Sequence, residues 1–149
     1  MQRLPDTTAR ARPENIAILL REPFVAANDV LLGELRKSGH AEVRAPHGAV
    51  FQYLDDGGTR VAELAARAQV TKQSMSELVA HLERHNYVER VADPDDGRAK
   101  LVRTTARGRE VYAIARQVVA DVEADWATKL GARRFSELRG LLEDLNAKI

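Results

Sequence analysis

The chain has 149 residues, 44% of them hydrophobic and 30% charged, and its 23 basic and 22 acidic side chains give a formal net charge of +1. This length fits one domain that buries a core unaided, and so small a net charge carries no nucleic-acid signal by itself. The chain has no cysteine, which excludes disulfides, cysteine-ligated metals and thiol-based redox sensing. No apolar run approaches the ~18 residues that span a bilayer, and residues 1–13 lack the apolar stretch of a secretory signal. We therefore expect a cytoplasmic protein with no membrane partner.

The N-terminal third is predicted to be an arm followed by a long helix. Residues 1–12 show no periodicity, so we expect a flexible arm. Apolar residues then recur at helical spacing up to Lys37, and Pro13-Glu14 is a favourable helix start. Pro23 lies inside this pattern and is expected to kink the helix or to split it in two. Residues 38–45 are predicted to be a loop.

Three shorter helices are predicted next. Pro46 opens the first, which ends before a run of two aspartates and two glycines. The second covers residues 61–68 with Thr59 as its N-cap, and the third covers residues 72–85 with Thr71 as its N-cap. Apolar side chains of the third helix recur on one face and are expected in the core: Met75, Leu78, Val79 and Leu82.

A hairpin and two more helices complete the chain. The β-prone runs 87–91 and 100–104 flank a stretch rich in aspartate, proline and glycine, which predicts a hairpin with a polar tip. Thr105 caps a long helix that ends at Gly131, and a last helix runs from Arg133 onward. The terminal helices carry long apolar stripes, so we expect them to pack on each other and on a second subunit.

The central segment has the order of a helix-turn-helix followed by a wing. Its second helix presents a polar face near the N-terminus, which suits entry into a DNA major groove. Gln73 has the amide that pairs with adenine, and Glu77 has a carboxylate that accepts from cytosine. The alternative is an ordinary solvated helix face, and spacing alone favours neither. The candidate DNA contacts of this helix are Thr71, Lys72, Gln73, Ser74, Ser76 and Glu77.

The predicted hairpin also carries a cluster of basic residues. Residues 98–109 hold five basic side chains and no acidic one, and a basic run beside a projecting turn suits phosphate contact. Arg98 is placed to enter a narrow minor groove, Asp96 is expected to hold the Arg98 side chain, and Lys100 is a further candidate contact. The alternative is a surface ion pair on an exposed turn, worth about 0–1 kcal/mol.

Two stretches carry a family resemblance. Residues 93–108, DPDDGRAKLVRTTARG, closely resemble the wing signature of the MarR family, the multiple-antibiotic-resistance-type regulators. Residues 61–79, VAELAARAQVTKQSMSELV, resemble the helix-turn-helix of the same family. The resemblance implies a mainly α fold with a small β-hairpin wing, in which residues 13–149 form a single domain. Within it the resemblance implies dimerisation helices at 13–45 and 105–149 and a winged helix-turn-helix lobe at 46–104.

The resemblance also implies a function. It indicates a homodimeric regulator, typically a repressor, whose recognition helices enter successive major grooves of a pseudopalindromic DNA operator while the wings reach the minor groove. Arg98 then matches the wing arginine of the family and Asp96 its acidic partner. The chain departs from the family pattern twice. Gly97 stands where many members have the first of two adjacent arginines, and Pro23 lies in the first helix.

Small aromatic or phenolic anions often release members of this family from DNA. The resemblance places such an effector between the dimerisation helices and the lobe, where Arg21 suits a carboxylate and His47 a phenol. The alternative is that the aromatic side chains are plain core and that His47 is a capping or exposed histidine. The candidate ligand-binding residues are Arg21, Phe24, His47, Phe51 and Trp126.

Other chemistry has little support in the sequence. His81 and His85 have the i, i+4 spacing of some metal sites, but no third ligand accompanies them, so we expect no metal. No nucleophile motif, phosphate loop or paired-carboxylate arrangement is present, so we expect neither an enzyme nor a cofactor. A winged scaffold that binds protein is the second hypothesis, and binding that does not respond to salt would favour it.

Overall fold

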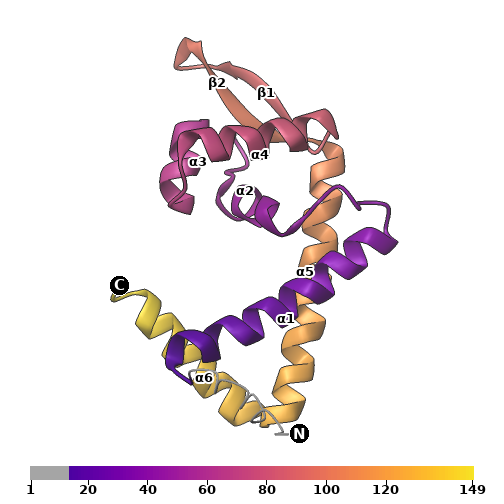
Figure 1. Ribbon diagram of the computed structural model, residues 1–149, viewed down its shortest axis with the longest axis vertical. Helices are drawn as coiled ribbons and strands as arrows, with labels where there is room; N and C mark the ends of the chain where they lie inside the picture. The colour runs from indigo at the N-terminus through magenta and orange to yellow at the C-terminus, as the bar shows by residue number, and fades with distance from the viewer. Residues whose placement is uncertain (1–13) are drawn as a thin grey trace, which may run out of the picture.

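The computed structural model describes residues 14–149, so the predicted arm at residues 1–12 lies outside the described residues. Two regions are visible in Figure 1. A lobe contains η1 (Ala45–His47), α2 (Gly48–Tyr53), α3 (Val61–Ala68), α4 (Lys72–Arg84) and an antiparallel pair of strands, β1 (Val88–Asp93) and β2 (Asp96–Thr104). Three outer helices are α1 (Ile16–Lys37), α5 (Ala106–Leu130) and α6 (Ala132–Asn146). The predicted winged helix-turn-helix with long terminal helices is confirmed.

Helix α1 differs from the prediction at its start and at Pro23. Asn15 is the N-cap, and its Oδ1 accepts a hydrogen bond from the Ile18 N–H at 3.1 Å, so the predicted start at Pro13-Glu14 is too early. The helix runs unbroken through Pro23, so a split there is wrong. A proline removes one backbone donor, and a helix of 22 residues keeps its hydrogen bonds on both sides.

The helix-turn-helix forms as predicted except at Thr59. Thr71 caps α4, because its Oγ1 accepts from the Ser74 N–H at 3.1 Å. Thr59 caps nothing: it is fully buried and forms a bridge with Val102, with both N–H···O distances at 2.9 Å. Its hydroxyl accepts from the Asp55 N–H at 2.9 Å. The free edge of β2 thus takes Thr59 as a partner, and a buried backbone donor is satisfied at the same time.

The core of the molecule lies inside the lobe. Met75, Val79 and Leu82 of α4 are fully buried, as the spacing predicted, and Leu78 is half-buried beside them. Leu64 of α3 and Val102 of β2 face them. Burial of each such side chain contributes roughly 1.5–3 kcal/mol, so the lobe holds α4 and the hairpin as one unit.

The wing has a bulge near its tip. Val88 pairs with Thr104 at one end, Ala92 pairs with Lys100 and Asp93 pairs with Asp96, so residues 97–99 have no partner on β1. The hairpin is confirmed, with longer strands than predicted. The bulge turns the segment that carries Arg98 out of the ladder.

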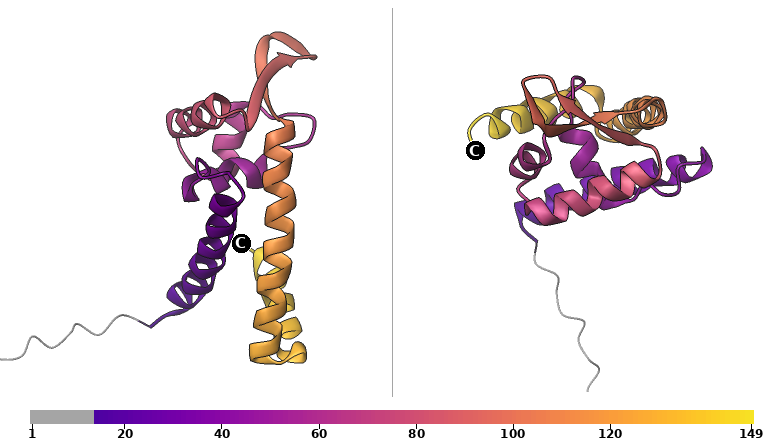
Figure 2. Two further views of the ribbon diagram at one scale, coloured as in Figure 1. Left: turned by 90° about the vertical axis from the view of Figure 1, so that its right-hand side faces the viewer. Right: turned by 90° about the horizontal axis from the view of Figure 1, so that it is seen from above.

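Helix α5 runs from the base of the wing to the far end of the molecule, as Figure 2 shows. Its predicted cap is confirmed, since the Thr105 Oγ1 accepts from the Gly108 N–H at 3.1 Å. A Cβ at Gly108 would lie 2.2 Å from the Tyr87 carbonyl oxygen, so only glycine fits. Gly131, at φ 89°, ends α5 and leads into α6.

The outer helices leave apolar side chains in solvent. Phe24 of α1 is 69% exposed and Leu141 of α6 is 67% exposed. Helix α6 has no buried side chain, and of α1 only Leu35, at its lobe end, is buried. Among residues 14–149 there is also no helix both long and apolar enough to cross a membrane.

Candidate nucleic-acid interface

The N-terminal half of α4 presents a polar face outward. Thr71, Lys72, Gln73, Ser74 and Glu77 are exposed and Ser76 is half-buried. The Gln73 Nε2 lies 3.5 Å from Glu77 Oε1, and the Thr71 hydroxyl donates to Ser74 Oγ at 2.9 Å. These contacts are exposed and lie within one turn of helix, so the face can exchange them for contacts with a ligand.

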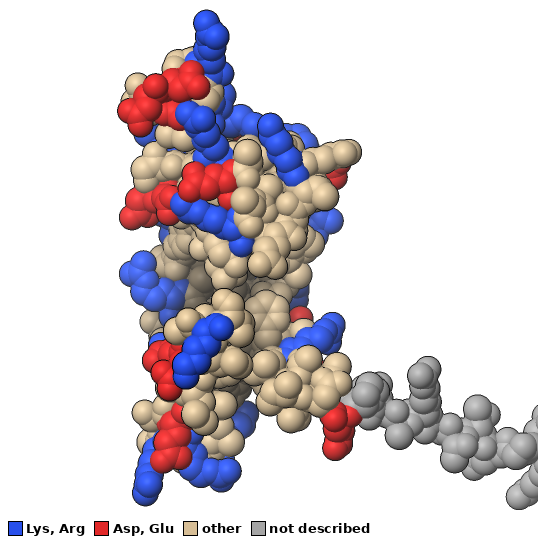
Figure 3. Space-filling model, turned by 90° about the vertical axis from the view of Figure 1, so that its left-hand side faces the viewer, with Lys and Arg blue, Asp and Glu red and all other residues tan. Residues whose placement is uncertain are grey.

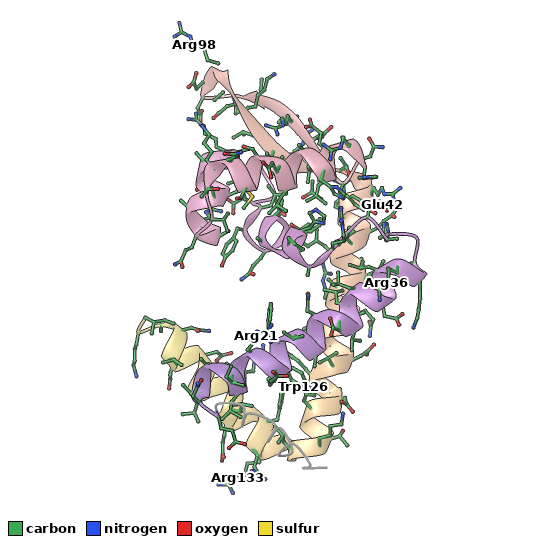
Figure 4. All side chains as sticks on the ribbon, in the orientation of Figure 1. Arg21, Arg36, Glu42, Arg98, Trp126 and Arg133 are labelled. Carbon is green, nitrogen blue, oxygen red and sulfur yellow. The ribbon has the colours of Figure 1, made fainter. Side chains whose placement is uncertain are left out.

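The wing tip projects two cations beyond the lobe. Arg98 and Lys100 are exposed, and Figure 4 shows Arg98 pointing away from the end of the hairpin. Within residues 14–149, no carboxylate oxygen lies within 4.0 Å of the charged nitrogens of Lys72, Arg98 or Lys100. Figure 3 shows basic side chains, with some acidic ones among them, at the end of the molecule that carries the wing. Unpaired cations on a projection retain their full charge for an anionic partner.

Asp96 acts on the backbone of Arg98. The Asp96 Oδ1 accepts from the Arg98 N–H at 3.1 Å, and no contact joins it to the guanidinium. The prediction that Asp96 holds the Arg98 side chain is therefore wrong. An aspartate bonds readily to the N–H two residues onward, so it shapes the bulge and leaves the guanidinium in solvent.

The other basic residues of the run make hydrogen bonds within the chain. Arg103 lies opposite Glu89 across the two strands and bonds it with Nη2 at 2.7 Å. The Arg107 Nη2 donates to the Tyr87 hydroxyl at 3.0 Å, and Arg109 reaches the Thr104 carbonyl oxygen at 3.4 Å. Of the five basic residues, Arg98 and Lys100 at the wing tip are the two whose side chains make no hydrogen bond within residues 14–149. The strand register that opposes Glu89 and Arg103 could have signalled one of these pairs.

Sequence reasoning missed an ion pair between α3 and the wing. The Arg60 Nε and Nη2 donate to Asp93 Oδ2 at 2.8 and 2.6 Å. The Asp95 N–H, which also bonds Asp93, and Arg60 hold the pKa of Asp93 below its usual value. The partners lie 33 residues apart, so no local pattern shows the pair.

A polar network joins the lobe to α5 and to the segment after α1. The buried Tyr87 hydroxyl donates to Glu42 Oε2 at 3.1 Å and lies 3.1 Å from His40 Nδ1. The Arg107 guanidinium bonds the same hydroxyl and lies over the Tyr87 ring, 4.6 Å from its centroid. Burial raises the pKa of Tyr87, so the phenol stays protonated and keeps its role as donor.

His47 is buried in the lobe. Only 3% of His47 is exposed, and its Nδ1 accepts a hydrogen bond from the Arg44 N–H at 2.9 Å. Its ring stacks on the His81 ring, with the ring centroids 4.5 Å apart. Burial, and then the nearby His81 and Arg44, lower the pKa of His47 to about 4. His81 Nε2 lies 2.9 Å from the Glu42 carbonyl oxygen. No group of three or more metal-ligating side chains occurs in residues 14–149.

The five candidate ligand residues do not share one cavity. Trp126 lines an apolar cleft of about 380 Å³ between α1 and α5, with Ala27 and Val30 opposite. Arg21 and Phe24 are exposed on α1 outside that cleft, and in Figure 4 Arg21 and Trp126 lie on opposite sides of the α1 ribbon. Phe51 lies in the lobe, where its ring and the Tyr112 ring form an edge-to-face pair with centroids 5.4 Å apart.

Parts of the chain are similar in sequence to known proteins. A family model described as the MarR family matches residues 43–99. The HTH-type transcriptional repressor Rv2887 of Mycobacterium tuberculosis is 36% identical over 90 residues, which cover 60% of this chain and 65% of that repressor. The transcriptional activatory protein BadR of Rhodopseudomonas palustris is 33% identical over 70 residues, or 47% of this chain and 40% of BadR. The aligned stretches thus span less than two thirds of these relatives.

The fold is similar to that of solved regulators over nearly the whole chain. The reduced form of MarR from E. coli superimposes with a TM-score of 0.74 at 20% identity, covering 91% of this chain and 98% of that one. The sequence match covers the segment that forms α2, α3, α4 and most of the wing, and the structural match adds the outer helices. Residues 43–99 are thus similar in sequence to the MarR family, and nearly the whole chain has the fold of the solved MarR structure.

Proposed function

We propose that the protein is a DNA-binding transcriptional regulator that acts in the cytoplasm and is not an enzyme. One observation carries this proposal: the polar N-terminal face of α4 and the unpaired cations of the wing tip lie at the same end of the molecule (Figure 1). A helix in a major groove and a wing in the adjacent minor groove require that arrangement. The near-neutral net charge does not oppose it, because carboxylates elsewhere balance cations that are already paired.

The roles of the side chains follow from their chemistry. Gln73 is the candidate for pairing with adenine, and Glu77 for accepting from cytosine. The hydroxyls of Thr71, Ser74 and Ser76 suit phosphates or base edges. Lys72 and Lys100 neutralise phosphates, and Arg98 enters the minor groove, where the negative potential is strongest.

We propose that the active form is a homodimer built by the outer helices. Helix α6 is 15 residues long and has no fully buried side chain within its own chain, and α1 presents Ile16, Leu19 and Phe24 to solvent. Exposed stripes of this size indicate an interface. A second copy supplies the same stripes and sets two recognition helices at a fixed spacing, which a pseudopalindromic operator requires.

We propose that the regulator represses and that a small aromatic or phenolic ligand releases it. Rv2887, a repressor, aligns over a longer stretch and at higher identity than BadR, an activator. The cleft that Trp126 lines offers an apolar surface to such a ligand, and the charged side chains beside it are Asp121 and the Asp125–Lys129 ion pair. A ligand that favours a dimer with another spacing of recognition helices would lower the population that fits the operator.

The test is selection from a random duplex DNA library with the wild type and Arg98→Ala at two salt concentrations. We expect the wild type to enrich a two-fold symmetric site with half-sites about one helical turn apart. Arg98→Ala should lose most of the affinity, and raising the salt should weaken the wild type steeply. Arg116→Ala is a matched control, since Arg116 is an exposed arginine on α5 outside the lobe.

Two results would contradict the proposal. Enrichment of no sequence at low salt would show that the lobe does not read DNA unaided. Binding by Arg98→Ala as tight as wild type would remove the wing from the interface. A protein partner bound with no response to salt would favour the alternative of a protein-binding scaffold.

A further inference from the structure

The Arg60–Asp93 pair lies where the wing meets α3. Arg60 is the residue just before α3, and Asp93 is the last residue of β1. Asp93 is only 7% exposed, whereas the Arg60 side chain is 47% exposed. Both Arg60 donors bond the same oxygen, Asp93 Oδ2, at 2.8 and 2.6 Å. A partly buried, charge-assisted pair of this kind is stronger than a surface ion pair.

The pair is continuous with the turn that presents Arg98. The second Asp93 oxygen, Oδ1, accepts from the Asp95 N–H at 2.9 Å. Asp96 lies across the ladder from Asp93, holds the Arg98 N–H, and places its Oδ2 3.8 Å from Arg60 Nη2. Arg60 is therefore connected to Arg98 through the two carboxylates that shape the tip.

The distal half of the wing has little else to hold it. Residues 97–99 have no partner on β1, and a two-stranded hairpin is marginal on its own. The other contact of the wing with the α3 side, the Thr59–Val102 bridge, lies near the base of β2. Among the hydrogen bonds and ion pairs of residues 14–149, those of Arg60 with Asp93 and Asp96 are the ones that tie the half of the wing beyond this bridge to the lobe.

We propose that Arg60, which lies outside both the recognition helix and the wing, is a positioning residue that fixes the wing against α3 and so delivers Arg98 to the minor groove. This inference rests on the proposed DNA-binding function. Under this proposal Arg98 contacts the DNA, whereas Arg60 acts through Arg98. It also assigns Asp93, rather than Asp96, as the carboxylate on which the orientation of the wing depends.

Asp93→Asn gives a test in which two explanations predict opposite signs. The substitution removes the ionic bond to Arg60 but keeps Oδ1 as an acceptor for the Asp95 N–H. It also removes a negative charge from a DNA-facing wing and frees Arg60, so electrostatics alone predicts tighter binding. Positioning predicts weaker binding, by about tenfold.

A double-mutant cycle with Arg98→Ala decides whether Arg60 acts through Arg98. We expect Arg60→Met to weaken binding about tenfold in the wild type and less than about twofold in the Arg98→Ala background. Arg60→Lys should restore part of the loss, since it keeps one charged donor. Arg67→Met is the matched control: Arg67 lies on α3 and pairs with Asp55 and Glu63, away from the wing. Its effect should be the same in both backgrounds.

A measurement without DNA keeps this inference separate from the proposed function. In the free protein, Asp93→Asn should lower the backbone order parameters of Gly97 and Arg98 and leave those of α4 unchanged. Unchanged order at the wing tip would overturn the inference, whether or not the wild type binds DNA. So would tighter binding by Asp93→Asn, or equal losses for Arg60→Met in both backgrounds, since these would make Arg60 a direct phosphate contact. If the wild type binds no duplex, the proposed function fails, and the order parameters still report on whether the Arg60–Asp93 pair fixes the wing.

Discussion

The lobe and the outer helices place the same kinds of side chain in opposite environments. Leu64, Met75 and Leu82 in the lobe are fully buried, whereas Phe24 of α1 and Leu141 of α6 are more than half exposed. Both regions show helical periodicity in their apolar residues, so the pattern alone does not tell them apart. The difference teaches that the lobe is stabilised within its own chain, while α1 and α6 require a surface from outside it, for which we propose a second copy.

The largest effect that would test this comparison is a matched pair of leucine substitutions. Leu64→Ala should lower the free energy of unfolding by about 2–5 kcal/mol at any protein concentration, because it leaves a cavity in the lobe. Leu141→Ala should destabilise by an amount that depends on protein concentration, since dimer stability includes association. Denaturant unfolding at two concentrations measures both. A concentration-independent effect of Leu141→Ala would argue against the dimer.

The next largest effect is the pH dependence of stability that arises from His47 in the lobe. The pKa of His47 is about 4 in the folded protein, against an ordinary value of 6.5. As the pH falls below 6.5 the unfolded chain binds a proton that the folded chain excludes, so stability is lost until about pH 4 and is unaffected above pH 6.5. The loss should reach about 3 kcal/mol at pH 4.

His47→Gln isolates this contribution, because glutamine does not titrate and its oxygen can still accept from Arg44 N–H. The variant should lose less stability than the wild type between pH 6.5 and pH 4. Parallel pH curves for the two proteins, measured by urea unfolding, would show that folding does not lower the pKa of His47.

Two glycine substitutions should differ in sign. Gly108→Ala would bring a Cβ to 2.2 Å from the Tyr87 carbonyl oxygen, and the forced shift should cost about 1–3 kcal/mol. Gly140 in α6 has nothing within 4 Å of a built Cβ, so Gly140→Ala should stabilise by about 0.5–1 kcal/mol through helix propensity. Thermal unfolding measures both. Destabilisation by Gly140→Ala would instead place a partner backbone close to that face of α6.

A further effect concerns the network that joins the lobe to α5. Tyr87→Phe removes the hydroxyl that contacts Glu42, His40 and Arg107, and we expect a loss of about 1–3 kcal/mol because the Nδ1 of the buried His40 is left unsatisfied. Hydrogen exchange of residues 39–43 should also speed up. Tyr53→Phe is the control, since the Tyr53 hydroxyl has no hydrogen-bond partner within residues 14–149. Equal effects of the two substitutions would show that the network does not stabilise the junction.

The candidate interface could be predicted from the sequence in part. The polar face of α4 follows from the positions of Met75, Val79 and Leu82, since the residues between them must face outward. The exposure of Arg98 follows from its place in a turn-rich segment. The function of Asp96 could not be predicted from the sequence, because whether a carboxylate bonds a backbone N–H or a side chain depends on the geometry of the bulge.

The sequence by itself determined the order of the elements and most of their ends. The caps at Thr71 and Thr105 and the stop at Gly131 are decided by side chains within a few residues, so local reasoning suffices. The sequence also carried the resemblance in the wing and the helix-turn-helix.

Only the tertiary structure decided which residues meet across the chain. It placed Thr59 against Val102 rather than at a helix cap, bonded Arg60 to Asp93, and buried His47 beside His81. Each contact joins residues more than 30 positions apart, where spacing carries no information about distance. The same reason applies to the apolar stripes: periodicity shows that a face is apolar, but burial depends on what packs against that face.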